Sequence, residues 1–245
     1  MTDRLSAPAK LTWSLRVVGV RVDGYHLIDA EMVALDLADG LTATPAATTT
    51  LTVSGPFAEG VPTDTSNLVV RALAVVQRTA AVHLDKQIPN GGGLGGGSAD
   101  AAAILRWAGV DDPATAASLG ADVPFCLAGG RARVTGIGDV IEPLPSVERI
   151  VTLVVPPLHV STPAVYRAWD ELGGPTAPGP NDLEPAAIQV EPRLVWWRDR
   201  IGELCGQVPR LAGSGATWFV EGRREGALGA LGGEGATVMV CRTAP

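Results

Sequence analysis

The chain has 245 residues, of which 46% are apolar, which suits a globular protein and excludes an intrinsically disordered one. The net charge of −7 argues against nucleic acid or an anionic membrane as partner, because such surfaces attract basic proteins. The three cysteines lack a C-x-x-C spacing, which predicts free thiols in the cytoplasm rather than disulfides or a zinc site. Only two lysines occur, Lys10 and Lys86, against a background of arginine.

The first part of the chain is predicted to alternate between strands and helices. Apolar and polar residues alternate in the strand-like segments, while the helical ones carry apolar residues on one face. Strands are predicted at residues 9–21, 27–46 (with a turn), 48–55 and 81–89, and helices at residues 64–80 and 98–109. Asp64 or Ser66 would cap the first helix and Ser98 the second, because their side chains can accept from free amides.

The second part begins with a short helix, a turn and an apolar segment at residues 111–130. The remaining predictions are a hairpin at 131–145, a strand at 149–157, helices at 162–172 and 190–204, a strand–turn unit at 210–222 and a strand at 236–243. Strands and helices mix without strict βαβ repetition, which predicts an α+β fold. A boundary is expected near residue 150.

A glycine-rich run, "NGGGLGGGSAD" at residues 90–100, has three interpretations. It could be a flexible linker, but a strand enters it, a helix leaves it, and Leu94 offers a packing anchor. It is not a Walker loop, because no lysine follows Gly96, and no acidic residue stands where a dinucleotide fold needs one. The third interpretation is a phosphate cradle, in which glycines approach the anion and a helix N-terminus offers its free amides.

Five motifs occur in order along the chain: "SAPAKLTWSLRV", "DGYH", "PNGGGLGGGSADAA", "LGADVPF" and "LAGSGATWFV". Together they resemble the GHMP kinase superfamily and, within it, the branch that acts on a cytidine diphosphate conjugate. "STPAVYRAWD" at 161–170 and "NDLEP" at 181–185 also look like that branch. The resemblance covers nearly the whole chain.

The resemblance implies a two-lobed α+β fold, with an N-terminal ATP-binding domain at 1–150, a C-terminal substrate-side domain at 151–245 and the site between them. It implies ATP and Mg²⁺ as cofactors, and phosphorylation of the 2-hydroxyl of a methylerythritol–cytidine diphosphate conjugate in non-mevalonate isoprenoid precursor synthesis. The expected partner is that small molecule, with no nucleic acid or membrane, and the expected protein is a cytoplasmic monomer or weak homodimer.

The resemblance also implies roles for individual residues. Asp122 would take the acceptor hydroxyl's proton, and Lys10 would hold Asp122 ionised. The expected ATP-binding residues are Asn67, Pro89, Asn90, Gly91, Gly92, Gly93, Leu94, Gly95, Gly96, Gly97, Ser98 and Ala99, of which Ser98 is also the candidate Mg²⁺ contact. The expected substrate-binding residues are Thr12, Tyr25, His26, Gly213, Ser214 and Gly215, with Tyr25 stacking on cytosine and His26 hydrogen bonding to its edge.

Several of these residues could instead have a purely structural role. Ser98 and Asn67 would merely start helices, Tyr25 and His26 would be buried, and the turn at 213–217 would serve packing alone. The chain departs from the family at Thr12, where asparagine is usual, at Ala99, where a second serine is usual, and in a shortened segment before residue 119. The competing functions are therefore a sister GHMP kinase acting on another small alcohol and a non-catalytic nucleotide-binding relative.

Overall fold

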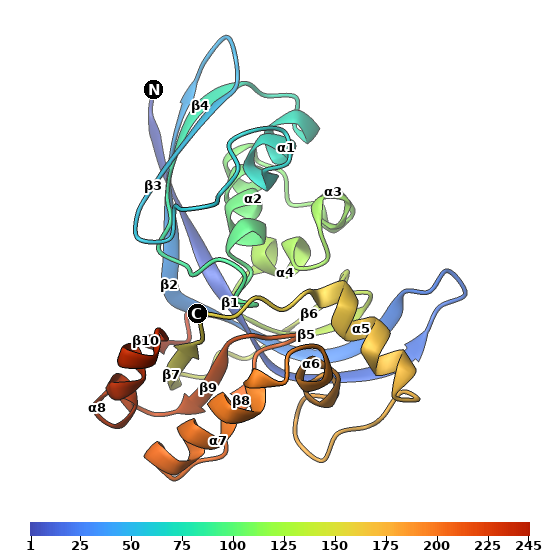
Figure 1. Ribbon diagram of the computed structural model, residues 1–245. Helices are drawn as coiled ribbons and strands as arrows, with labels where there is room; N and C mark the ends of the chain where they lie inside the picture. The colour runs from blue at the N-terminus through green and yellow to red at the C-terminus, as the bar shows by residue number, and fades with distance from the viewer.

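The computed structural model describes residues 1–245 and contains two β-sheets with helices packed against them (Figure 1). Two long strands, β1 (Asp3–Val20) and β2 (His26–Pro45), pair antiparallel and form the spine of the first sheet. The free edge of β2 pairs with β4 towards its C-terminal end and with β5 towards its N-terminal end. The other strands of this sheet are β3 (Thr50–Ser54), β4 (Ala80–Asp85), β5 (Arg131–Gly136) and β6 (Val140–Leu144).

The prediction of a turn inside residues 27–46 is wrong, because β2 runs through this segment without a break. Gly40 pairs with Ser6 on one side and with Asp85 on the other, so the sheet continues across it. The predicted strands on either side of this segment and the hairpin at 131–145 are confirmed.

Four helices cover one face of the first sheet (Figure 1). They are α1 (Leu68–Val75), α2 (Gly96–Trp107), α3 (Pro113–Leu119) and α4 (Val123–Ala128). Helix α2 is the central one, and its residues 99–105 are all buried. Four of these buried residues are alanines, whose small side chains let α2 pack against the sheet. The packed helix holds the C-terminal end of the glycine loop.

The predicted helix caps are corrected by the structure. Asn67 caps α1 by accepting from the Val69 amide at 2.8 Å, while Asp64 accepts from Ser66 in the turn before it. Helix α2 begins at Gly96, two residues before Ser98, and its N-cap is Gly95 with φ 69°. Only glycine adopts that left-handed conformation without strain, so glycine rather than serine sets the start of α2.

The second sheet has the strand order β10-β7-β9-β8 and is antiparallel throughout. Its strands are β7 (Ile150–Val155), β8 (Arg210–Leu211), β9 (Trp218–Glu221) and β10 (Thr237–Arg242). The helices of this part are α5 (Thr162–Glu171), α6 (Glu184–Val190), α7 (Arg193–Cys205), α8 (Glu225–Leu228) and the 3₁₀ helix η1 (Gly229–Glu234). The sequence did not predict α6, α8 or η1, which are short and rich in proline or glycine.

The two sheets meet along β1 and β2, where Leu11 and Leu35 share a buried cluster with Leu153 of β7 and Phe219 of β9. The loop before α6 also contacts β1. Leu15 on β1 donates its amide to the Pro180 carbonyl and accepts from the Asp182 amide, both at 2.9 Å. The sequence passes from one sheet to the other between Leu144 and Ile150, and the division into domains at residue 150 stays a prediction. None of the helices is long and apolar enough to cross a membrane.

Candidate active site

A cavity of about 760 Å³ lies between the first sheet, helices α3 and α4, helix α5 and the turn after β8. Its wall brings together residues from distant parts of the chain. The predicted site residues on this wall are Lys10, Thr12, Tyr25, His26, Gly93, Ser98, Asp122, Gly213 and Ser214. Both predicted catalytic residues and parts of every predicted motif therefore face one space.

Lys10 and Asp122 form an ion pair in this cavity. The Lys10 Nζ lies 3.2 Å from the Asp122 Oδ2, and it also donates to the Thr12 Oγ1 at 3.2 Å. The Lys10 side chain is 7% exposed, whereas that of Asp122 is 34% exposed. The aspartate stands at the N-terminus of α4, where it makes no capping hydrogen bond. The carboxylate is thus held by one cation and remains open to a ligand in the cavity.

The glycine loop passes so close to its neighbours that side chains would not fit. A Cβ at Gly93 would lie 2.8 Å from the Gly215 carbonyl oxygen, and a Cβ at Gly95 would lie 2.6 Å from the Lys10 Cγ. Both glycines also have positive φ, 76° and 69°. The loop therefore packs directly on Lys10 and on the small-residue turn, which explains why glycines fill it.

The loop leaves backbone amides free at the start of α2. The first intrahelical bond runs from the Ala99 amide to the Gly95 carbonyl, so the amides of residues 96–98 have no partner within the helix. The Ser98 hydroxyl forms no hydrogen bond to the protein and lies on the cavity wall. Free amides and a free hydroxyl at a helix N-terminus fit a phosphate.

Leu94 and Ala99, two residues of the predicted phosphate cradle, have buried side chains. The Leu94 side chain is 1% exposed and packs in the core, and its carbonyl accepts from the Lys10 amide at 2.9 Å. Ala99 is fully buried, and its amide is used within α2. Neither residue lines the cavity, and an ATP contact by either one stays a prediction. The position at which the family usually has a second serine is therefore in the core of this protein and not on the cavity wall.

The tip of the β1–β2 hairpin and helix α5 form the far wall. Tyr25 is 60% exposed, so it is not a core residue. His26 instead stacks on Tyr166, with ring centroids 4.6 Å apart, and its Nε2 hydrogen bonds to the Asp170 Oδ1 at 2.8 Å. The His26 ring is therefore anchored on α5, while Tyr25 presents an aromatic face to the solvent side of the cavity.

The sequence missed three cavity residues on α5, although it singled out the segment that holds them. Tyr166 and Asp170 are four residues apart and so share one face of the helix, with Arg167 beside them. Burial and the nearby Asp122 charge raise the pKa of Tyr166 to about 12, so its phenol stays protonated. Arg167 is exposed on the cavity wall and forms no salt bridge, which makes it the one unpaired cation there.

The "NDLEP" segment holds the turn after β8 in place. Asn181 is buried, and its Nδ2 donates to the carbonyls of Leu211 and Gly213 at 2.9 and 2.7 Å. Gly213 lies against Thr12 and Lys10, and the Ser214 hydroxyl is 2.7 Å from the Thr162 hydroxyl. Asn181, which bridges to Leu15 on β1, thus links that strand to the turn that faces Lys10.

Of the twelve predicted ATP residues only Gly93 and Ser98 line this cavity, and Asn67 and Asn90 are among the ten that do not. Asn67 caps α1 and donates its Nδ2 to the Pro62 carbonyl at 2.7 Å, so its amide is used within the protein. Asn90 donates to the Phe57 carbonyl and holds the segment before α1 against the loop. An adenine contact for either residue stays a prediction. No group of three or more His, Cys, Asp or Glu residues is arranged to hold a metal ion by itself.

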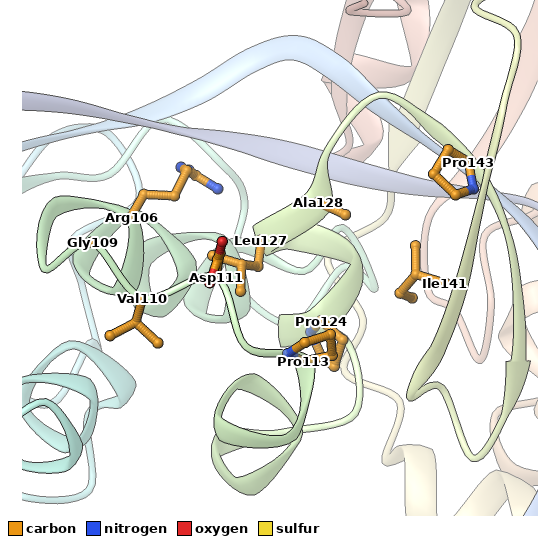
Figure 2. A pocket seen from close by; sticks show the side chains of 10 residues that line it. All are labelled: Arg106, Gly109, Val110, Asp111, Pro113, Pro124, Leu127, Ala128, Ile141 and Pro143. Carbon is orange, nitrogen blue, oxygen red and sulfur yellow. The ribbon is translucent and has the colours of Figure 1, made fainter.

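A second hollow, of about 470 Å³, lies on the outside of the helical layer (Figure 2). The ends of α2 and α4, the start of α3 and strand β6 surround it, with Arg106, Asp111 and Pro143 among the side chains in view. Arg106 is engaged with the Cys126 carbonyl at 2.6 Å. The hollow borders the segment that looked shortened, and none of the predicted site residues lines it.

The fold and the site define a class of protein. Residues 67–130, which contain α1, the glycine loop, α2 and Asp122, match the GHMP kinases N terminal domain. A mevalonate kinase from Methanococcus jannaschii has the same fold, with a TM-score of 0.62 over 100% of this chain and 99% of that chain at 13% identity. The predicted α+β GHMP kinase fold is confirmed.

Closer relatives narrow the class. A 4-diphosphocytidyl-2-C-methyl-D-erythritol kinase from Paracoccus denitrificans is 40% identical, over 88% of this chain and 85% of the relative. One from Jannaschia sp. is 41% identical, over 89% of this chain and 88% of the relative. A crystal structure of 4-(cytidine 5'-diphospho)-2C-methyl-D-erythritol kinase matches with a TM-score of 0.80 at 32% identity, covering 99% of this chain and 100% of that chain. The chain belongs to the 4-diphosphocytidyl-2-C-methyl-D-erythritol kinase family of ATP-dependent kinases.

Proposed function

We propose that this kinase phosphorylates the 2-hydroxyl of 4-diphosphocytidyl-2-C-methyl-D-erythritol, with Asp122 as the base. The observation that carries the proposal is the Lys10–Asp122 ion pair, 3.2 Å long, in a cavity that has a glycine loop on one wall and aromatic rings on another. The loop suits a nucleotide phosphate, and the rings suit a nucleobase. The pair lies between them, where a sugar alcohol joined to that base would end.

In the proposed reaction the acceptor oxygen attacks the γ-phosphorus as the bond to the β–γ bridging oxygen breaks. The proton of the acceptor hydroxyl passes to the Asp122 carboxylate, whose 34% exposed side chain faces the cavity. Lys10 stabilises that carboxylate and, through the same ammonium group, helps to aim the hydroxyl. Since the loop packs on Lys10 at Gly95, phosphate and base are held by one connected structure.

ATP with Mg²⁺ would supply the phosphoryl group and neutralise its charge. The uncapped start of α2 and the free Ser98 hydroxyl fit the phosphates, with Ser98 the candidate contact for the ion. The protein offers no ready-made cluster of metal ligands, which suits an ion carried in by the nucleotide.

The cytidine end would lie at the hairpin tip. Tyr25 offers an exposed ring, and Tyr166 lies on the cavity wall behind His26. Arg167 is the unpaired cation on this wall, where a diphosphate between base and sugar alcohol needs neutralising. Because the His26 Nε2 is hydrogen bonded to Asp170, the His26 ring serves to order this wall.

The test is a coupled ADP-release assay on purified protein with ATP, Mg²⁺ and the cytidine conjugate. We expect turnover with this substrate and none with mevalonate or homoserine. Phosphorylation of one of those alcohols without turnover of the conjugate would assign the protein to a sister activity. No turnover of any of them would favour a non-catalytic nucleotide-binding protein.

The departures at Thr12 and Ala99 are two of the three grounds for that last alternative, the third being the shortened segment before residue 119. Ala99 is buried away from the cavity, so its missing hydroxyl removes nothing from the site. Thr12 still accepts a hydrogen bond from Lys10 at 3.2 Å. Both observations support the catalytic function.

A further inference from the structure

The second of the two lysines, Lys86, has no role in the reaction described above. It follows β4 and precedes the glycine loop, and it is 2% exposed, so no ligand in the cavity touches it. A fully buried ammonium ion is costly unless it is paired and hydrogen bonded. Its partners therefore indicate what it holds.

Lys86 joins three segments of the chain around its ammonium group. The Nζ donates to the Asp39 Oδ2 and, at 3.0 Å, to the Asp100 Oδ2. Asp39 lies on β2 and Asp100 in the second turn of α2, and both are buried. The Asp39 Oδ1 accepts from the amides of Gln87 and Ile88, at 2.6 and 2.8 Å.

These contacts fix both ends of the glycine loop. The amides of residues 87 and 88 belong to the segment that enters the loop, and Asp100 belongs to the helix that leaves it. The ammonium group lies directly behind the start of that helix, because a Cβ at Gly96 would be 3.0 Å from the Lys86 Nζ. The loop between them contains six glycines and has little stiffness of its own.

A buried ion triad is weak support for stability, because apolar residues of similar volume often do as well or better. What charged hydrogen bonds add is a defined geometry. We propose that Lys86, with Asp39 and Asp100, is a positioning residue that sets the phosphate-binding amides of residues 96–98 relative to Lys10. The triad acts through the loop backbone and contacts neither nucleotide nor acceptor.

The test compares nucleotide affinity with stability. Lys86→Met alone leaves two buried carboxylates facing each other and is expected to unfold the protein. We therefore use the neutral triple variant Asp39→Asn, Lys86→Met, Asp100→Asn, with Asp100→Asn alone in parallel. The matched control is Arg106→Met, which removes hydrogen bonds to the Ser6 and Cys126 carbonyls at the other end of α2.

The readout is the dissociation constant of adenylyl imidodiphosphate with Mg²⁺, measured by calorimetry on folded protein. We expect it to rise about tenfold or more in the triple variant, the usual scale for a lost supporting contact, and by less in Asp100→Asn. The KM for the phosphoryl acceptor should stay within about twofold. Arg106→Met should lower the melting temperature and leave nucleotide affinity unchanged.

A nucleotide affinity within about twofold of wild type in the folded triple variant would overturn the proposal and leave the triad a stabilising element only. If the triple variant does not fold, unchanged affinity in Asp100→Asn overturns it by itself. Because calorimetry needs no acceptor, the result does not depend on which alcohol the kinase phosphorylates.

Discussion

The two lysines of the chain make almost the same contact in two different settings. Lys10 lies 3.2 Å from the Asp122 carboxylate in an open cavity, and Lys86 lies 3.0 Å from the Asp100 carboxylate in the core. The Asp122 side chain is 34% exposed, and that of Asp100 is 4% exposed. One aspartate can reach a ligand and the other cannot, so we propose that the same pair of residue types serves catalysis in one place and positioning in the other.

The glycine loop connects these two settings. Gly95 packs on Lys10, and Gly96, the next residue, packs on Lys86. A loop held between a lysine in the cavity and a lysine in the core needs residues without side chains on both sides. Substitutions in the cavity should therefore change catalysis or substrate binding, and substitutions around Lys86 should not change the chemical step.

Asp122→Asn should cause the largest loss. An amide cannot take the hydroxyl proton, so kcat should fall by roughly 10²–10⁴-fold while nucleotide affinity is kept. Steady-state ADP release measures this. Asp112→Asn is the control, since Asp112 caps α3 and asparagine caps equally well. A kcat near that of wild type in Asp122→Asn would remove Asp122 as the base.

Lys10→Met should lower kcat by about 10- to 100-fold, because a hydrogen bond from a charged donor contributes about 1.5–3 kcal/mol. The methionine keeps the contact with Gly95 but lacks the ammonium group. Single-turnover kinetics at saturating ATP separate this effect from binding. If the loss appeared only in the KM for ATP, Lys10 would be a nucleotide-binding residue instead.

Tyr25→Ala should raise the KM for the cytidine conjugate by about 5- to 100-fold and change kcat little. Stacking of one base on an aromatic ring is worth about 1–3 kcal/mol, and the Tyr25 ring is 60% exposed, with the Arg21 guanidinium 6.0 Å from its centroid. Tyr25→Phe is the matched control and should behave as wild type. An unchanged KM in Tyr25→Ala would place the base elsewhere.

Asp100→Asn should flatten the pH dependence of stability. Burial raises the pKa of Asp100 to about 7, with Lys86 opposing the shift. An unfolded chain loses this proton near pH 4, so folding takes up a proton, and the free energy of unfolding falls as pH rises from about 4 to 7. The fall is up to about 1.4 kcal/mol per pH unit. Urea melts across this range should show a smaller slope for Asp100→Asn, and parallel curves would contradict the assignment.

Local patterns predicted much of the fold and the contents of the site. Most strands followed from alternating residues, and five motifs predicted which segments meet, including the Lys10–Asp122 pair. Motifs of this kind identify residues that are expected to bind ligands. They do not identify the residue at which a helix begins, because the left-handed conformation of Gly95 depends on the residues packed around it.

The partners of Lys86 could not be predicted in this way. Asp39 lies 47 residues before Lys86 and Asp100 lies 14 residues after it, and no periodic pattern relates them. The only sequence signal for Lys86 was that it is one of just two lysines in a chain whose other basic side chains are mostly arginine. Tyr166 and Asp170 were more accessible to prediction, since a four-residue spacing on a predicted helix places both on one face.

The most direct measurement sets Lys10→Met beside the neutral triple variant of the Lys86 triad, and records kcat and nucleotide affinity for each. We expect opposite losses in the two variants. Lys10→Met should bind adenylyl imidodiphosphate within a few-fold of wild type but turn over slowly, while the triple variant should bind it weakly and turn over normally at saturating ATP. Loss of the same parameter in both variants would contradict separate roles for the two lysines.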